Sequence, residues 1–266
     1  MTHHIVEAID LHYTYPDGTI GLQGVSFRIS HGESVAIIGE NGAGKSTLLL
    51  HLNGCLTATQ GTLRIGDFPL NPKNLNAVRR SVGMVFQNPD DQLFMPTVFD
   101  DVAFGPLNFG LTKDEVEQIV FQVLETVGVR QLAKRPPYKL SQGEKRSVSI
   151  ATVLAMSPDI LVMDEPTSSL DPRSRRRLIE LLKTFQHTKI IATHDLDLAL
   201  ELCERTIILH GGRVAVDGQT QKILQDEALL HANSLEKPLC LQHITLWKPN
   251  KIPIHTREHS DYTHKK

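Results

Sequence analysis

The stretch Gly39-Glu40-Asn41-Gly42-Ala43-Gly44-Lys45-Ser46-Thr47 matches G-x-x-x-x-G-K-[ST], the pattern of a phosphate-binding loop. It follows the apolar run Ser34–Ile38 and precedes the leucine-rich residues 45–52, so the sequence predicts a loop between a buried strand and a helix. Glycines let successive backbone N–H groups point inward, and the helix adds its positive N-terminal end. Lys45 is expected to neutralise phosphate oxygens, and Ser46 to place its hydroxyl on Mg²⁺.

Length, charge and cysteine content limit what the chain can be. Its 266 residues can form one large domain or two small ones, and a net charge of −2 gives no basic field for nucleic-acid binding. No apolar run approaches the roughly 18 residues that span a bilayer, and the start of the chain lacks the features of a signal peptide. Cys55, Cys203 and Cys240 follow no pairing or zinc pattern, which favours reduced thiols. A membrane role is therefore expected to require a partner protein.

Strands are predicted at residues 5–11 and 24–29, on both sides of the turn Tyr15-Pro16-Asp17-Gly18. An aromatic side chain here, Tyr13 or Tyr15, either stacks on a nucleotide base or packs against the neighbouring strand, and the residues alone favour packing. Further strands are predicted at 61–65 and 82–86. The second ends at Gln87, and the carboxyl edge of an α/β sheet is where ligand groups lie.

Residues 88–157 change from strand-like to helical patterns. One helix is predicted to begin at Thr97, and another at the capping box formed by Thr112 and Glu115. The loop at 91–96 that enters this region carries apolar residues. They either form part of a groove for a partner or fold onto the protein's own core.

A second capping box, Ser141 with Glu144, opens a helix that is predicted to run to about Met156. The box explains these residues without any ligand. An exposed helix N-terminus with a serine and the neighbouring Gly143 is also an anion site, so the chemical interpretation stays open beside the structural one.

Residues 159–163 predict a buried strand that delivers two carboxylates, Asp164 and Glu165, at its end. Two adjacent acids on a buried strand are costly unless they are ligated or take part in chemistry, although a solvated pair is the simpler alternative. Beside a phosphate-binding loop, Asp164 is expected to hold Mg²⁺ through water. Glu165 is then expected to orient or deprotonate an attacking water.

A further strand, at 189–193, ends at His194, which is either a structural histidine or a donor to a γ-phosphate. The arginines of 173–177 are predicted to form a solvated face of the preceding helix. A hairpin closes the sheet across Gly211-Gly212. After a short helix near Ile223, the tail is expected to be polar and irregular. Its histidines, which lack ligand-like spacing, are His243, His255, His259 and His264.

Together these residues resemble the ATP-binding-cassette (ABC) ATPases over residues 5–218. The family's motifs occur in order: the Walker A loop at 39–46, the Q-loop glutamine Gln87, the signature motif at 140–144, the Walker B strand at 160–165, the D-loop at 169–171 and the switch histidine His194. The resemblance implies an α/β fold, a P-loop NTPase (RecA-like) core with an N-terminal antiparallel β subdomain and an inserted α-helical subdomain at about 90–157. It also implies a nucleotide-binding domain at 1–222 and a C-terminal extension at 223–266.

The resemblance further implies an ATPase with Mg²⁺, in which two subunits sandwich two ATP molecules and each phosphate loop faces the partner's signature helix. Tyr15 is expected to stack on adenine, which reverses the preference drawn from the residues alone. Catalytic roles fall to Glu165, His194, Gln87 and Lys45, and Mg²⁺ ligands are Ser46, Gln87 and Asp164. Nucleotide contacts are Tyr15, Gly39, Asn41, Gly42, Gly44, Lys45, Ser46, Thr47, Ser141 and Gly143.

More narrowly, residues 85–94 and 101–108 are similar to the ATPase subunits of energy-coupling-factor importers, and residues 153–158 to their cobalt/nickel branch. This similarity implies a peripheral protein at the cytoplasmic face of the cell membrane and a second ATPase subunit, identical or not. T-type and substrate-binding membrane subunits are expected to dock near Leu93, Phe94, Met95 and Val98.

Two alternatives remain beside cobalt or nickel import. The ATPase can serve vitamin uptake, because cargo contacts lie in other chains. A soluble ABC ATPase of translation or chromosome maintenance is the other. Chromosome-type cassettes carry a long coiled-coil insertion, whereas no sustained heptads separate loop and signature here, and translation-type ones pair two cassettes in one chain. The signature departs from Leu-Ser-Gly-Gly-Gln at Gln142 and Glu144, and Ser147 occupies the usual arginine position.

Overall fold

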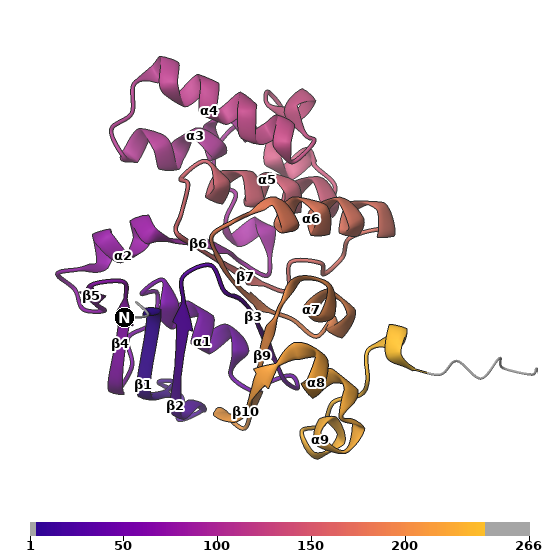
Figure 1. Ribbon diagram of the computed structural model, residues 1–266. Helices are drawn as coiled ribbons and strands as arrows, with labels where there is room; N and C mark the ends of the chain where they lie inside the picture. The colour runs from indigo at the N-terminus through magenta and orange to yellow at the C-terminus, as the bar shows by residue number, and fades with distance from the viewer. Residues whose placement is uncertain (1–3, 243–266) are drawn as a thin grey trace, which may run out of the picture.

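The computed structural model describes residues 4–242, which form two β-sheets and a group of outer helices (Figure 1). The smaller sheet is antiparallel, with strand order β2-β1-β4-β5. Its strands are β1 (His4–Thr14), β2 (Ile20–Ser30), β4 (Gln60–Ile65) and β5 (Phe68–Pro69). The predicted turn at Tyr15-Pro16-Asp17-Gly18 connects β1 to β2, as Pro-Asp-Gly chemistry favours.

The larger sheet positions the site. Its strand order is β10-β9-β3-β8-β7-β6, and β3, β6, β7, β8 and β9 run parallel. The strands are β3 (Ser34–Ile38), β6 (Val82–Val85), β7 (Ile160–Asp164), β8 (Thr188–Ala192), β9 (Arg205–His210) and β10 (Arg213–Gln219). Because both faces of the central strands are buried, they read as continuous apolar runs. Their carboxyl ends meet at one edge.

Helices cover both faces of this sheet (Figure 1). Helix α1 (Lys45–Leu52) packs with the smaller sheet on one face, where Leu48, Leu49 and Leu52 join its core. On the other face lie α6 (Pro172–Thr184), α7 (Leu196–Leu202), α8 (Thr220–Gln225) and α9 (Glu227–Ala232). The short helix α2 (Leu75–Ser81) leads into β6. Within residues 4–242, no helix has both the length and the hydropathy to cross a bilayer.

The region between β6 and β7 is helical, as predicted: residues 88–157, all of which are described, contain no strand. Its helices are α3 (Val98–Asn108), α4 (Lys113–Thr126) and α5 (Gln142–Leu154), and they enclose a core of their own. Both predicted capping boxes are present, Thr112 with Glu115 on α4 and Ser141 with Glu144 on α5. The fold is therefore the predicted P-loop NTPase core with antiparallel and helical parts.

One expectation about the outer surface is wrong. The chain beyond Leu224 is not irregular at once, because α9 forms there: Asp226 caps it and Leu230 is fully buried, so tertiary packing stabilises a helix too short to form alone. The arginines at the start of α6 do form a mainly solvated face, since Arg173, Arg176 and Arg177 are exposed; Arg175 is partly buried and donates to Asp195 at 2.8 and 3.1 Å. The tail histidines, His243 onward, lie outside the described residues.

Candidate active site

The loop between β3 and α1 forms a cradle at the carboxyl edge of the larger sheet. Gly42 and Gly44 have φ values of 82° and 101°, the left-handed region that glycine adopts without strain. Lys45 is buried, and its ammonium donates to the carbonyls of Gly39 at 2.8 Å and Glu40 at 3.0 Å. An ammonium has three donors, so two fix the side chain across the loop and one remains for an anion.

A cavity of about 330 Å³ opens over this cradle. Most of the predicted site residues line it: Tyr15, Asn41, Gly42, Gly44, Lys45, Ser46, Thr47, Gln87, Asp164 and Glu165. They come from the β1–β2 turn, the loop, α1 and the ends of β6 and β7. Gly39 is not among the lining residues, but its carbonyl accepts a hydrogen bond from Lys45.

The end of β7 brings a carboxylate to the base of the cradle. Asp164 is 4% exposed, and its Oδ1 has no hydrogen-bond partner among residues 4–242. Burial raises the pKa of Asp164, partly offset by a hydrogen bond from the Ser46 hydroxyl. An orphaned buried carboxylate oxygen beside a hydroxyl and the Gln87 amide is the oxygen-donor set that Mg²⁺ prefers, so these residues fit the ion.

Glu165 follows at once and is held from the neighbouring strand. Its φ of 47° lies in the left-handed region, a strain that costs of order 1 kcal/mol or more and that functional sites retain. Its Oε2 accepts from the Thr193 hydroxyl and the His194 backbone N–H, both at 3.2 Å, and lies 2.8 Å from His194 Nδ1. The His194 side chain is 69% exposed, so it is not a buried structural histidine. The ring and the end of β8 fix the direction of the carboxylate.

The two tyrosines of the β1–β2 turn take different positions. The Tyr13 ring packs against the core and meets the Tyr15 ring edge-on, with centroids 4.9 Å apart. The Tyr15 hydroxyl lies 2.9 Å from Thr47 Oγ1, and Tyr15 lines the cavity. Tyr13 thus packs, whereas Tyr15 lies where a base attached to phosphates in the cradle can reach it.

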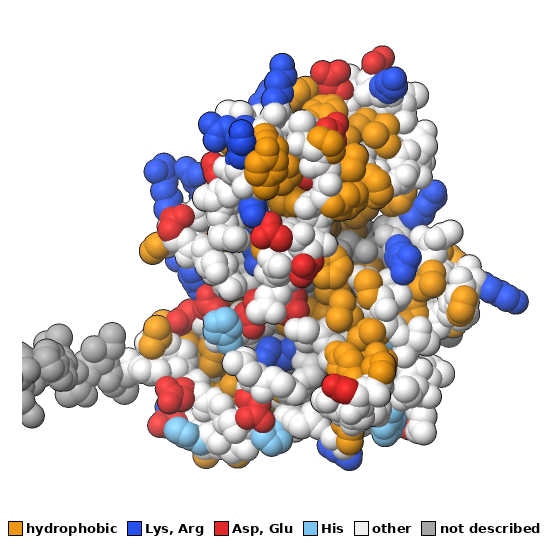
Figure 2. All heavy atoms as spheres, turned by 180° about the vertical axis from the view of Figure 1, so that it is seen from behind, with side chains coloured by type: hydrophobic (Ala, Val, Ile, Leu, Met, Phe, Trp, Pro, Cys, Tyr) orange, Lys and Arg blue, Asp and Glu red, His pale blue; other side chains and the backbone are white. Residues whose placement is uncertain are grey.

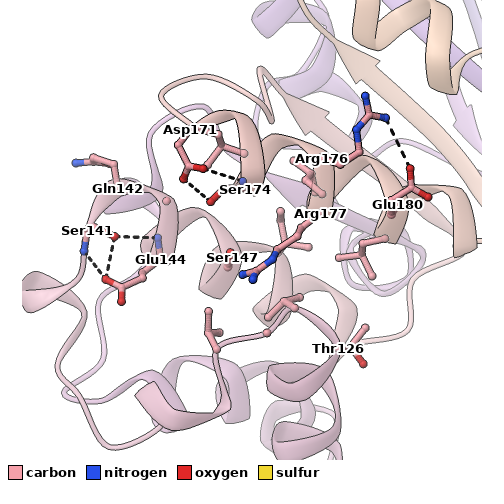
Figure 3. A pocket seen from close by; sticks show the side chains of 18 of the residues that line it. Thr126, Ser141, Gln142, Glu144, Ser147, Asp171, Ser174, Arg176, Arg177 and Glu180 are labelled. Carbon is pink, nitrogen blue, oxygen red and sulfur yellow. Dashed lines mark hydrogen bonds and ion pairs between the residues drawn. The ribbon is translucent and has the colours of Figure 1, made fainter.

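Ser141 and Gly143 are not at this cavity. They line a separate hollow of about 1050 Å³ between α4, α5 and α6 (Figure 3). The Ser141 hydroxyl accepts from Glu144 N–H at 3.3 Å, and Glu144 Oε2 accepts from Ser141 N–H at 2.8 Å. D-loop residues Ser169 and Asp171 line the same hollow. The phosphate-binding loop and the Ser141 helix end therefore lie at two separate hollows of one chain.

Sequence reasoning missed the residue that ties these regions together. Arg146 of α5 is 3% exposed, and its guanidinium donates to the carbonyls of Phe86, at 2.6 Å, and Gln87. Burial lowers the pKa of Arg146, while the carboxylates of Asp164 and Glu165 oppose that shift. The signal was available, because 146 lies at helical spacing from the buried Ile150 and Val153.

Gln92 makes a second connection between β6 and α5. Its amide nitrogen donates to the carbonyl of Ser149 at 2.8 Å and to the Thr152 hydroxyl at 2.7 Å, and its oxygen accepts from Phe86 N–H at 3.2 Å. Lys145 adds an ion pair to Asp90. The segment after β6 is thus bonded to α5 along its length.

The predicted docking positions need correction. Leu93 and Val98 are 8% and 0% exposed and belong to the core of α3–α5, so they are unavailable to a partner. The reason is Asp101, whose Oδ1 accepts from the N–H groups of Phe94 and Met95 at 3.0 Å and turns the loop so that Phe94 points outward. The Phe94 and Phe104 rings stack edge-on at 5.1 Å, and both are exposed. Figure 2 shows hydrophobic side chains gathered over this helical region.

Comparison with known proteins gives consistent results. A family model described as "ABC transporter" matches residues 22–168. A putative ABC transporter ATP-binding protein of Geobacter sulfurreducens is 64% identical over 91% of this chain and 97% of its own length. An energy-coupling factor transporter ATP-binding protein of Methanocaldococcus jannaschii is 43% identical over 94% and 92%. The solved structure of cbiO1 from Clostridium perfringens, part of an ABC transporter complex, has a TM-score of 0.75 at 37% identity and covers 86% and 94%.

Proposed function

The chain belongs to the ABC transporter ATPases, and we propose that it energises an importer of the energy-coupling-factor type, with cobalt or nickel ions as cargo. ATP binding and hydrolysis belong to the family. The importer type is supported by the similarity to an energy-coupling factor ATP-binding protein and to cbiO1. The cargo rests on the resemblance of residues 153–158 to the cobalt/nickel branch.

The observation that carries the mechanism is the convergence of Lys45, Asp164 and Glu165 on one cavity. The loop N–H groups and Lys45 bind the phosphates of ATP, with the N-terminus of α1 adding a favourable dipole. Ser46, Gln87 and Asp164 would hold Mg²⁺, which when bound offsets negative charge on the phosphates. Tyr15 stacks on the adenine.

Glu165 is the general base of this proposal. Its carboxylate takes a proton from water while the water oxygen attacks the γ-phosphorus, and the bond to ADP breaks with the electron pair leaving on the β-phosphate oxygen. His194 has two tasks, since its Nδ1 orients Glu165 and its exposed ring can donate to the γ-phosphate. Orientation by a second group is what keeps a catalytic base in line.

A second ATPase subunit completes the site. Because Ser141 and Gly143 line a different hollow from the cradle, a nucleotide in one subunit meets them only from the partner. The subunits are identical or a related pair. ATP bound between the two subunits then holds them together. Hydrolysis converts the bridging ATP into ADP and phosphate, and the subunits separate.

Membrane subunits of the T-type and substrate-binding kinds are proposed to dock on the exposed Phe94 and Phe104, at the cytoplasmic face of the membrane. Aromatic pairs of this kind anchor protein interfaces. The exposed Asp91 lies three residues before Phe94, whereas Asp90 is already paired with Lys145, so a partner segment with a basic residue beside its apolar ones suits this surface. The chain is then a peripheral membrane protein.

The test of the catalytic assignment is Glu165→Gln, with the exposed Glu117→Gln on α4 as control. Hydrolysis should fall by about 10²-fold or more, because a general base is lost. ATP-dependent dimerisation, measured by light scattering, should persist. Undiminished hydrolysis would exclude Glu165 as the base, and a Glu165→Gln chain that stays monomeric at saturating Mg·ATP would exclude the shared site.

The importer assignment is tested by the proteins that co-purify and by transport. Capture with the tagged subunit should recover integral membrane proteins. Lipid vesicles that contain the captured complex should take up Co²⁺ or Ni²⁺ when ATP is supplied. Uptake of a vitamin instead would contradict cobalt or nickel as the cargo. Capture of ribosomes or DNA without membrane proteins would contradict the importer.

A further inference from the structure

The turn between β9 and β10 lies along the outside of the phosphate-binding loop. At one end, a Cβ added at Gly39 would lie 2.3 Å from the carbonyl oxygen of Leu209, so the two backbones touch. At the other end, Gly212 N–H donates to the carbonyl of Ala43 at 3.1 Å. Between them, His210 Nδ1 lies 3.5 Å from a carboxylate oxygen of Glu40. The loop is therefore contacted along most of its length by a turn that no nucleotide motif includes.

Strand β2 holds this turn from the other side. The backbone N–H of Gln23 donates to the carbonyl of Gly212 at 2.8 Å, and the Gln23 side chain donates to Gly211 at 3.0 Å. Arg213 in turn donates to the Gln23 amide oxygen at 3.1 Å. A Cβ at Gly44 would lie 2.5 Å from the Gly21 oxygen and 3.6 Å from Gly212 Cα, so loop, turn and strand pack backbone to backbone.

The bond from Gly212 to Ala43 has a consequence for the cradle. In a trans peptide the C=O and the following N–H point in opposite directions. Since the Ala43 carbonyl points outward to Gly212, the Gly44 N–H is directed to the opposite side, and Gly44 lines the cavity. Gly212 thus fixes the orientation of a peptide whose N–H is available to a phosphate.

We propose that Gly212 and Gln23 are positioning residues for nucleotide binding. Gly212 holds the Ala43–Gly44 peptide in its donating orientation, and Gln23 holds Gly212 against the loop. A hydrogen-bond donor that is already oriented loses no conformational freedom when the nucleotide binds. If the Gly44 N–H is less well oriented, the affinity for nucleotide should fall more than the rate of hydrolysis of bound ATP. This inference rests on the nucleotide binding of the family and is independent of the proposed cargo.

The decisive variant is Gly212→Ala, with Gly66→Ala as its matched control. Both glycines have positive φ, 74° and 54°, so alanine strains the backbone at each. A Cβ at 212 would lie 3.0 Å from the Gly21 oxygen and 3.3 Å from Leu22 Cα, whereas at 66 nothing lies within 4 Å. Only the first substitution therefore disturbs the packing of the turn against β2, by which Gln23 holds Gly212 in place.

The readouts are the Kd for Mg·ADP by fluorescence titration, KM and kcat for ATP, and Tm. Gly212→Ala should raise Kd and KM about tenfold, the value of a hydrogen bond to a charged group, with kcat at saturation within about twofold. Gly66→Ala should leave Kd unchanged at a similar loss of Tm. Equal Kd values for the two variants would overturn the proposal.

Gln23→Ala keeps the inference testable if Gly212→Ala does not fold. It removes the side-chain bonds to Gly211 and Arg213 but keeps the backbone bond to Gly212, so Kd should rise by a smaller factor, about threefold. A Kd for Gln23→Ala equal to that of the unmodified chain, with Gly212→Ala unfolded, would also overturn the proposal. A raised Kd for Gly212→Ala, together with no ATP-driven uptake of Co²⁺ or Ni²⁺ by the unmodified chain and its membrane partners, would support this inference and contradict only the proposed importer.

Discussion

Two helix N-termini in this chain, those of α1 and α5, are built in opposite ways. Helix α1 begins after Gly44, which has no side-chain cap, so its first N–H groups stay available at the cavity. Helix α5 begins after Ser141, whose hydroxyl and Glu144 satisfy each other's backbone groups. The first end has no side chain of its own to satisfy its N–H groups, whereas at the second the backbone N–H groups of Ser141 and Glu144 are satisfied within the chain. A helix end that is already formed can meet a partner's nucleotide without first having to order.

Removal of the Lys45 ammonium at the α1 end should have the largest effect, a loss of nucleotide affinity. Lys45→Ala leaves the uncapped end of α1 without its cation, and loss of charged hydrogen bonds worth about 1.5–3 kcal/mol each should weaken Mg·ATP binding by about 10²-fold. Fluorescence titration measures the change. Lys73→Ala, an exposed lysine, is the control, and an unchanged Kd for Lys45→Ala would refute the assignment of the α1 end.

Paired substitution of the two capping boxes separates capping from catalysis. Ser141→Ala and Thr112→Ala should each cost about 1 kcal/mol of unfolding free energy, since both remove an N-cap. Only Ser141→Ala should also lower ATP turnover, by about 10- to 100-fold, because its hydroxyl is expected to reach the partner's phosphate. Urea unfolding and steady-state ATPase assays measure the two effects. Equal turnover of both variants would make the Ser141 box purely structural.

Acid titration should give the smallest effect. The pKa of Glu144 is lowered mainly by the Ser141 backbone N–H, and the pKa of Glu115 mainly by the Thr112 hydroxyl. A carboxylate with a depressed pKa stabilises the fold above its unfolded pKa and loses that contribution as pH falls through its folded pKa. Tm should therefore decline below about pH 4.5, and less steeply in Glu144→Gln and Glu115→Gln. Identical slopes in all three chains would show that neither box titrates.

The cradle could be predicted from the sequence because its parts are local or lie at strand ends. The loop pattern places Lys45 and Ser46, and the ends of parallel strands share one edge, which brings Gln87 and Asp164 to the same cavity. The fold class followed from the same alternation of strands and helices. Whether Ser141 faces the cradle of its own chain was not readable, since helix periodicity gives no placement between subdomains.

The burial of particular side chains was the second feature that the sequence could not predict. Docking near Leu93 and Val98 was expected from the family resemblance, whereas the residues of the 91–96 loop alone left packing onto the protein's own core open. Both side chains are buried, and Asp101 turns the loop so that Phe94 is exposed instead. Arg146 was overlooked because a basic residue on a helix is usually exposed, whereas here backbone carbonyls from a distant strand satisfy its guanidinium. Such contacts depend on tertiary structure, which periodicity does not describe.

The hydrogen bonds of Arg146 and Gln92 connect α5 to the segment after β6, which includes Gln87 in the cavity wall. A rotation of α5 relative to the larger sheet would move the carbonyls of Phe86 and Gln87, because Arg146 is bonded to both. The Gln87 side chain would then move toward the cavity or away from it. Phe94 follows Gln92 in the same segment, so a displacement at the exposed Phe94 would reach α5 and the Gln87 side chain at the cavity through these hydrogen bonds.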